Sequence, residues 1–138
     1  MTLANNDFTE RFHDIARDSG WHVPTRPAQV LGAWEAFVTT CMGGYEFDLS
    51  EYLNDLSIRQ FIQLVLDDSE AKRTEMYKLF AERIRRIDDR FCKLVSEGPL
   101  IRPRSDLWWD QRIPPYGAAD FVEDARERYS VELRVVDD

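Results

Sequence analysis

The stretch of residues 69–96, which contains no glycine or proline, constrains the fold more than any other feature of the chain. Large apolar residues recur along it at alternating spacings of three and four, which is the pattern of one face of an α-helix. They are Tyr77, Phe80, Ile84, Ile87, Phe91 and Leu94. Glu82 and Arg86 form an acid-before-base pair four residues apart, which supports the same helix. The pattern predicts one long helix from about residue 69 to residue 96.

Two further helices are predicted near the start of the chain from caps, breakers and apolar stripes. The first is capped by Asn5 or Asn6 and ends at Gly20. Its apolar stripe is Phe8, Phe12, Ile15 and Ala16. The second begins near Pro27 and ends at the pair Gly43-Gly44. Its apolar face is Val30, Leu31, Trp34, Phe37, Val38 and Cys41.

The segment after the glycine pair predicts two shorter helices. Asp48 followed by Glu51 has the spacing of a capping box, so a helix is expected from Leu49, with Phe47 packed in the core as a hydrophobic staple. A second start near Ser57 predicts a helix to about residue 66.

The C-terminal third mixes an irregular segment with a helix and a strand. Residues 99–117 contain four of the six prolines and the pair Trp108-Trp109, and they show no helical or strand period. We expect one of these rings to face the core and the other the surface. A helix is predicted from about residue 118, and the alternating residues of SVELRVV predict a strand. Its candidate partners are the short segments 21–23, 100–102 and 111–113.

Together these elements predict a mainly α fold in a single domain of residues 1–138. Five or six helices would pack around the long helix, with one minor C-terminal β-strand. At 138 residues the chain is long enough to fold around one core without a metal or disulfide. Cys41 and Cys92 are expected on apolar helix faces as buried, reduced thiols in a cytoplasmic protein, because no leader-like or membrane-spanning stretch is present.

The sequence offers no motif for catalysis, metal binding or a cofactor. The two histidines, His13 and His22, are too few for the phosphohydrolase sites that His13-Asp14 resembles. There is no glycine-rich phosphate loop, nucleophile elbow or zinc-ligand spacing. The net charge of −8 disfavours nucleic acids and anionic membranes as partners and suits a basic protein. We therefore predict no catalytic residue, no metal and no cofactor.

Aromatic residues interleaved with acids mark two candidate partner-binding segments. Tyrosine and tryptophan provide rigid contact area, and carboxylates orient a basic partner. The predicted binding residues are Tyr45, Glu46, Asp48, Glu51, Tyr52, Asp55, Trp108, Trp109, Asp110 and Tyr116. A competing interpretation assigns some of these aromatics to the core.

The pattern W-x2-FV-x4-GGYEFDLSEYLNDLSIR resembles one found in small uncharacterised bacterial α-helical proteins. The residues that carry it are Trp34, Phe37, Val38, Gly43, Gly44, Tyr45, Asp48, Leu49, Tyr52, Asn54, Asp55, Leu56 and Arg59. The resemblance implies a bacterial source and a helical fold, and it brings no activity.

These observations favour a non-catalytic, acidic protein-binding module. A concrete form is a bacterial immunity or antitoxin-like inhibitor that covers the basic surface of a toxin or nuclease. One alternative is a small enzyme or ligand-binding protein with a carboxylate and aromatic pocket. It would use Asp106, Asp110 or the Asp48 cluster, which consists of Asp48, Glu51 and Asp55. Another is a self-associating scaffold in which the C-terminal strand pairs with its copy in a homodimer.

Overall fold

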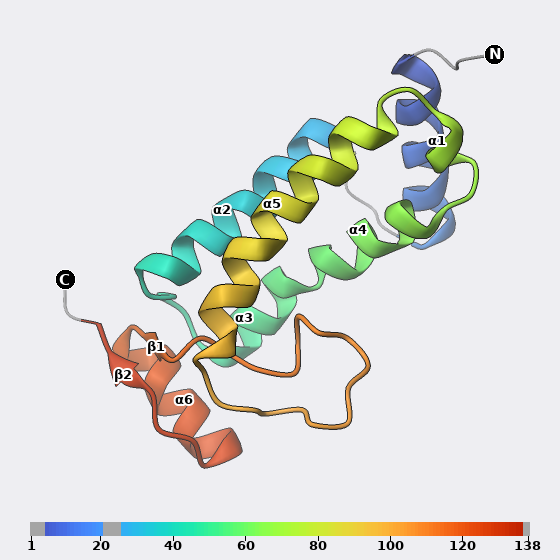
Figure 1. The fold of residues 1–138 in the computed structure, drawn as a ribbon. Helices are drawn as coiled ribbons and strands as arrows, with labels where there is room; N and C mark the ends of the chain where they lie inside the picture. The colour runs from blue at the N-terminus through green and yellow to red at the C-terminus, as the bar shows by residue number, and fades with distance from the viewer. Residues whose placement is uncertain (1–4, 21–25, 137–138) are drawn as a thin grey trace.

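The computed structural model describes residues 5–20 and 26–136, with side chains from residue 7 onward, and it confirms the mainly α fold (Figure 1). Its elements are α1 (Asn5–Asp18), α2 (Pro27–Gly43), α3 (Leu49–Leu56), α4 (Ile58–Asp67), the 3-10 turn η1 (Ala71–Arg73), α5 (Tyr77–Ser96), β1 (Tyr116–Gly117), α6 (Ala119–Tyr129) and β2 (Arg134–Val135). The proposed strand partner 21–23, His22 and the side chains of Asn5 and Asn6 lie outside the described residues.

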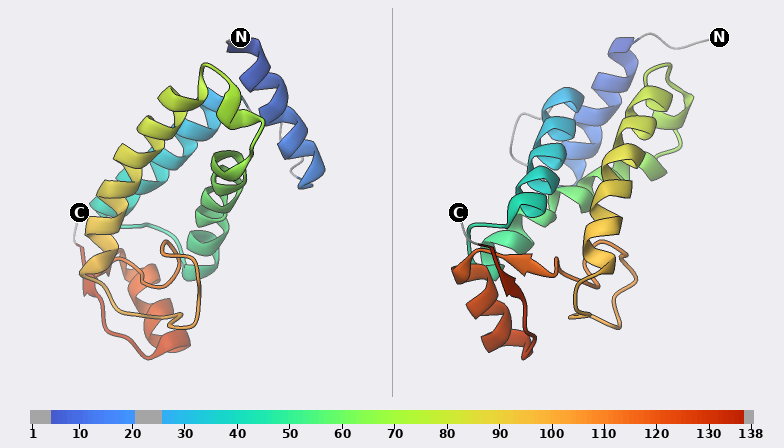
Figure 2. Two further views of the ribbon diagram at one scale, coloured as in Figure 1. Left: turned by 45° about the vertical axis from the view of Figure 1, so that its right-hand side comes forward. Right: turned by 60° about the vertical axis from the view of Figure 1, so that its left-hand side comes forward.

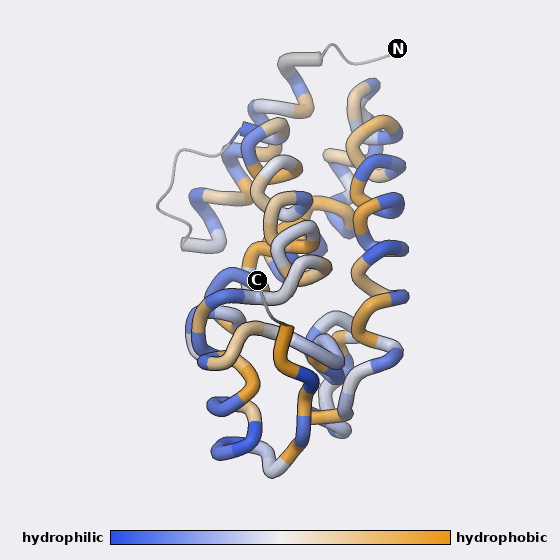
Figure 3. The backbone as a smooth tube through the Cα atoms, turned by 90° about the vertical axis from the view of Figure 1, so that its left-hand side faces the viewer, coloured by the Kyte–Doolittle hydropathy of each residue, from blue (hydrophilic) through white to orange (hydrophobic). Residues whose placement is uncertain are grey.

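The long helix α5 lies alongside α2, and the two run in the same direction (Figures 1 and 2). Their shared interface is aromatic, because the ring of Trp34 lies 5.3 Å from that of Phe91 and stacks on Phe37 at 5.7 Å. Helix α4 packs against α2, while α1 covers the end of the molecule opposite α6 (Figure 2). Figure 3 shows polar and apolar residues alternating along the helices, which leaves each with an apolar side for this core.

The long helix begins at Tyr77, eight residues later than the sequence predicts. The carboxylate of Asp68 accepts a hydrogen bond from the backbone N–H of Ala71 at 2.8 Å. The hydroxyl of Thr74 then donates to the Ala71 carbonyl at 2.7 Å, which closes the turn η1. Asp68 is also held by Arg11 of α1, at 2.6 Å. These contacts fix a turn where helix propensity alone would have continued the helix.

The Pro/Trp-rich segment 99–117 is irregular, as predicted, but it is packed against the helices. Leu100 and Arg112 form an antiparallel bridge, so two of the proposed strand segments pair with each other. Ile113 is fully buried, and its carbonyl lies so close to Gly98 that a Cβ there would fall 1.6 Å from the oxygen. Glycine is therefore required where the chain leaves α5.

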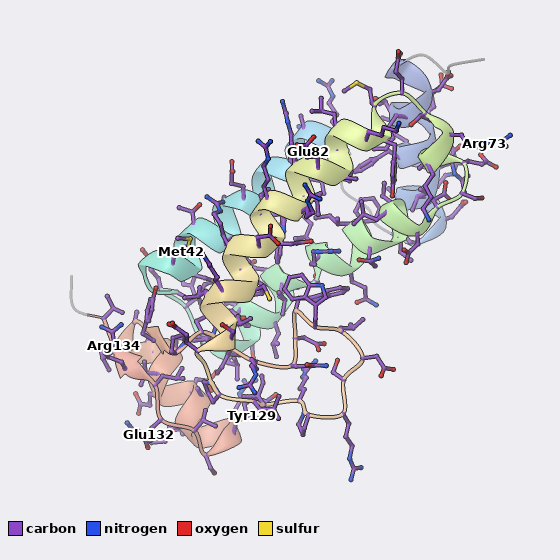
Figure 4. All side chains as sticks on the ribbon, in the orientation of Figure 1. Met42, Arg73, Glu82, Tyr129, Glu132 and Arg134 are labelled. Atoms are coloured by element: carbon purple, nitrogen blue, oxygen red, sulfur yellow. The ribbon has the colours of Figure 1, made fainter. Side chains whose placement is uncertain are left out.

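The C-terminal strand is shorter than predicted, and it pairs within its own chain. β2 lies parallel to β1, with Tyr116 opposite Arg134. The hydroxyl of Tyr116 donates to the Met42 carbonyl at 2.6 Å. This bond fastens the strand pair to the end of α2, where Met42 lies (Figure 4). The observed partner of β2 is therefore β1, and not one of the three segments proposed from the sequence.

The two cysteines differ in environment. Cys41 is buried in the core, and burial raises the pKa of its thiol. Cys92 is exposed, so its predicted place on the apolar face of α5 is wrong: it follows Phe91 by one residue, which turns it away from the seam. Both thiols are free.

Candidate functional site

The connection between α2 and α3 is held rigidly at its first aromatic residue. Gly44 adopts a φ of 106°, a conformation that favours glycine, and turns the chain away from α2. The side chain of Tyr45 then enters the core, where only 1% of it is exposed. Its hydroxyl donates to Asp55 at 2.6 Å, and its carbonyl accepts from the N–H of Ala118 at 2.9 Å. Burial and this hydrogen bond raise the pKa of Tyr45.

Phe47 lies outside the core, and the predicted staple is wrong. Its side chain is 56% exposed, and its ring rests edge-on against Tyr45 at 5.9 Å. The ring of Tyr52, which the staple would have contacted, faces inward against Phe121 at 5.2 Å. The inner positions are therefore filled by tyrosines, and the ring that sequence assigned to the core remains outside.

Phe47 borders a hollow of about 430 Å³ between the start of α3 and one side of α6. Apart from Phe47, its walls are carboxylates, and we call it the acidic hollow. Its acidic residues are Asp48, Glu51, Asp120, Glu123, Asp124 and Glu127.

Two of these carboxylates fix the geometry of the acidic hollow. Asp48 caps α3 as predicted, accepting from the N–H of Glu51 at 2.9 Å. Asp124 reaches from α6 to accept the N–H of Leu49 at 2.7 Å, and it pairs with Arg128 at 3.1 Å. The start of α3 is thereby bound to α6, so both walls belong to one rigid unit.

The other four carboxylates, Glu51, Asp120, Glu123 and Glu127, make no ion pair with any residue that the structure describes. Like charges at this density create a negative potential that attracts cations and repels phosphate. Within the same described ranges, no three His, Cys, Asp or Glu side chains are arranged to hold a metal ion. The structure divides the Asp48 cluster: Asp48 and Glu51 line the acidic hollow, whereas Asp55 accepts the hydroxyl of Tyr45 and lines the neighbouring hollow.

A second hollow, of about 480 Å³, lies on the other side of Phe47, between α2 and the junction of α3 with α4. Small side chains of α2 form one wall, namely Ala33, Ala36 and Thr40. Asn54, Asp55 and Ile58 are on the opposite wall. Phe47 is therefore accessible from two sides, one acidic and one largely apolar.

The tryptophan pair belongs to a different, buried arrangement, which we call the tryptophan cluster: Trp34, Arg59, Asp88, Trp108 and Trp109. Arg59 is 3% exposed, and its guanidinium donates to Asp88 at 2.9 and 2.8 Å. Trp34 donates its ring N–H to the same carboxylate at 3.0 Å. The guanidinium carbon lies 4.7 Å from the ring centre of Trp109 and 5.8 Å from that of Trp108, a cation–π geometry.

The tryptophan cluster resolves which ring faces the core. Trp109 is 4% exposed and offers no side-chain surface to a partner, whereas Trp108 is half-buried. Asp110 is also used internally, since it accepts hydrogen bonds from Ser105 and from Arg102. Tyr116 is half-buried beneath Arg134. The predicted binding segment 108–116 is therefore mainly a packed strap.

Tyr45 and Tyr52 are predicted to bind a partner, but both are buried, so they are core residues. Tyr52 is fully enclosed, burial raises the pKa of its hydroxyl, and that hydroxyl finds no hydrogen-bond partner in the described part of the chain. Glu46 is exposed, although it does not line the acidic hollow. Only Asp48 and Glu51 of the predicted set lie within that hollow.

The sequence-based prediction does not include the residues that α6 contributes to the acidic hollow. These residues, Asp120, Glu123, Asp124 and Glu127, follow one another at spacings of three, one and three, which places them on one helix face. This acidic stripe was visible in the sequence and could have been joined to the Asp48 cluster.

The chain matches no known protein family, and no curated protein or solved structure is significantly similar to it. The resemblance carried by Trp34–Arg59 thus stays a prediction. Among the described helices, none is both long and apolar enough to cross a membrane.

Proposed function

We propose that this chain is a non-catalytic protein-binding module whose acidic hollow and Phe47 dock on the basic surface of another protein. The observation that carries the proposal is the exposed ring of Phe47, supported from below by Tyr45 and bordered by six carboxylates. Binding energy at interfaces is concentrated in a few anchor side chains surrounded by polar groups, and Phe47 beside these carboxylates fits that arrangement. Covering such a ring contributes affinity, and the surrounding charges orient the partner.

The charge of the acidic hollow narrows the partner class. Four of its six carboxylates make no ion pair with a described residue. The pKa of Arg126 is raised mainly by its hydrogen bond to Glu132 and further by Glu123, the only one of the four that is close enough to that arginine. Lysine or arginine from a partner would neutralise the four carboxylates. Nucleic acid is disfavoured because its phosphates would be repelled. Two copies of this chain would repel each other through the same surface, which disfavours a homodimer formed there.

The concrete function that we propose is an immunity or antitoxin-like inhibitor. Enzymes that act on nucleic acids carry basic active-site surfaces. A small acidic protein with an exposed aromatic anchor can cover such a surface and exclude the substrate. Affinity would come from Phe47, and fast association from the carboxylates.

The test is quantitative capture from an extract of the organism that makes the protein, with the native chain and Phe47→Ser as parallel baits. We expect a basic protein to be retained by the native chain and at least about tenfold less by Phe47→Ser, a loss of about 1.4 kcal/mol. Leu64→Ser is the control, because Leu64 is 46% exposed on α4, outside both hollows beside Phe47. Equal retention by Phe47→Ser and native chain would contradict the proposal.

A further inference from the structure

Residues of α1, α2 and α5 line a separate groove. These three helices meet at the end of the molecule opposite α6 (Figures 1 and 2). The volume of the groove is about 310 Å³, at the lower limit of small-ligand sites. The floor and walls are apolar, with Phe8 from α1, Leu31 from α2, and Leu79 and Phe80 from α5. Leu79 is 43% exposed, so the groove is an open apolar surface that no described residue covers.

Among the described residues that line this groove, the charged ones are two arginines, Arg26 and Arg83, and we call it the arginine groove. Neither guanidinium pairs with a carboxylate among residues 7–20 and 26–136. This local excess of positive charge contrasts with the net charge of −8 of the whole chain. Electrostatically, the arginine groove is the opposite of the acidic hollow.

Among the described residues, the neighbouring surface along α2 and α5 provides no carboxylate that pairs with Arg83. A hollow of about 360 Å³ continues from the arginine groove and shares Leu31 and Arg83 with it. The acidic residue in its lining, Glu35, is paired with Arg90 at 3.5 Å. Arg83 lines both the arginine groove and this hollow, and it makes no ion pair with a described carboxylate.

We propose that the arginine groove binds a single-chain anionic amphiphile, namely a free fatty carboxylate. The acyl chain would lie against Phe8, Leu79 and Phe80, where its burial removes apolar surface from water. The carboxylate would accept charge-assisted hydrogen bonds from Arg26 and Arg83. The volume of about 310 Å³ and the mainly apolar lining suit one unbranched chain, and the two arginines select the sign of the headgroup.

The charge preference gives a direct test by calorimetry with the full chain and two probes of equal chain length, both kept below their micellar concentrations. The probes are sodium dodecanoate and dodecyltrimethylammonium bromide. Long-range attraction to a chain of charge −8 would favour the cation. We expect the opposite order, with dodecanoate at least about tenfold tighter.

Two variants locate the site. In Arg26→Gln/Arg83→Gln the preference for dodecanoate over the cationic probe should disappear, while Leu79→Asp should weaken dodecanoate at least about tenfold. The matched control is Arg73→Gln/Arg104→Gln, which removes the same charge from exposed positions; Arg73 points away from the body of the molecule (Figure 4). Each variant is first compared with the native chain for its melting temperature, so that a loss of fold is recognised.

The proposal is overturned if dodecanoate does not bind, or if the cationic probe binds more tightly. It is also overturned if the variant at Arg26 and Arg83 binds dodecanoate as well as its control does. Because the arginine groove and the acidic hollow share no residue, failure here leaves the capture result with Phe47→Ser unaffected.

Discussion

The tryptophan cluster and the acidic hollow both place an aromatic ring beside charged groups, with opposite consequences. In the tryptophan cluster Arg59 is 3% exposed, and Asp88, Gln63 and the ring of Trp109 surround its guanidinium. In the acidic hollow Phe47 is 56% exposed, and four of the six carboxylates make no ion pair with a described residue. Charges that are buried and paired hold the fold together, whereas exposed and unpaired charges remain for another molecule.

The comparison predicts that substitutions in the two regions will separate stability from binding. A residue of the tryptophan cluster should change the free energy of unfolding strongly. A substitution at the acidic hollow should change the free energy of unfolding little and reduce the capture of a partner instead.

The largest effect is expected for Arg59→Met, which removes the cation and leaves the Asp88 carboxylate without its main partner. Loss of one member of a buried ion pair costs about 3–5 kcal/mol. Denaturant unfolding of the native chain and the variant measures this difference. Arg85→Met on the exposed side of α5 is the control and should stay within about 0.5 kcal/mol. A loss below about 1 kcal/mol for Arg59→Met would show that the tryptophan cluster does not hold the fold.

An intermediate effect is expected for Asp68→Asn, because this ion pair is only partly buried. The hydrogen bonds from Arg11 lower the pKa of Asp68, and the side chains of Arg11 and Asp68 are 27% and 14% exposed. The variant keeps an acceptor for the N–H of Ala71 but loses the charge, so we expect a loss of about 1–2 kcal/mol near neutral pH.

The pH dependence of the stability lost in Asp68→Asn follows from the direction in which the pKa of Asp68 is shifted. The pKa of Asp68 in the folded chain lies below the ordinary aspartate value of about 3.9, so the unfolded chain takes up the proton first as pH falls. The stabilisation is therefore complete above about pH 5 and disappears as pH falls through the folded pKa. Unfolding free energies of the native chain and Asp68→Asn should differ above about pH 5 and converge as pH falls through the folded pKa of Asp68; a constant difference would contradict this assignment.

The smallest change in stability is expected for Phe47→Ser. Its ring contacts Tyr45 and is otherwise mainly in water, so the free energy of unfolding should change by no more than about 0.5–1 kcal/mol. Phe121→Ser is the buried comparison, and a loss of about 3–5 kcal/mol is expected there. If Phe47→Ser were as destabilising as Phe121→Ser, Phe47 would be a core residue and the docking surface would lose its anchor.

Much of the fold could be predicted because local sequence determines it. The Gly43-Gly44 pair ends α2, and Asp48 caps α3 at the expected residue. The start of α5 could not be predicted in the same way, because the turn before it depends on a bond between Asp68 and Arg11, 57 residues earlier. No helix-breaking residue marks that position.

The candidate site was harder to predict than the fold. Tyr45, Phe47 and Tyr52 have similar sequence surroundings, and their burial is decided by rings from distant elements such as Phe37 and Phe121. The same ambiguity applies to Trp109, whose place beside Arg59 is set by tertiary packing. Interleaved aromatic and acidic residues therefore indicated two segments of interest without showing which one is exposed.

The most direct test of the account is whether reversing charges in the acidic hollow reduces the capture of a basic partner. Glu123→Lys/Glu127→Lys reverses two exposed carboxylates of α6, and Glu75→Lys/Glu97→Lys makes the same change of net charge at exposed positions outside the acidic hollow. Retention of the partner by the native chain, measured by quantitative mass spectrometry, is the reference. We predict that the first variant retains at least about tenfold less while the second retains nearly as much. Equal losses in both variants, or none in the first, would contradict the assignment of binding to the acidic hollow.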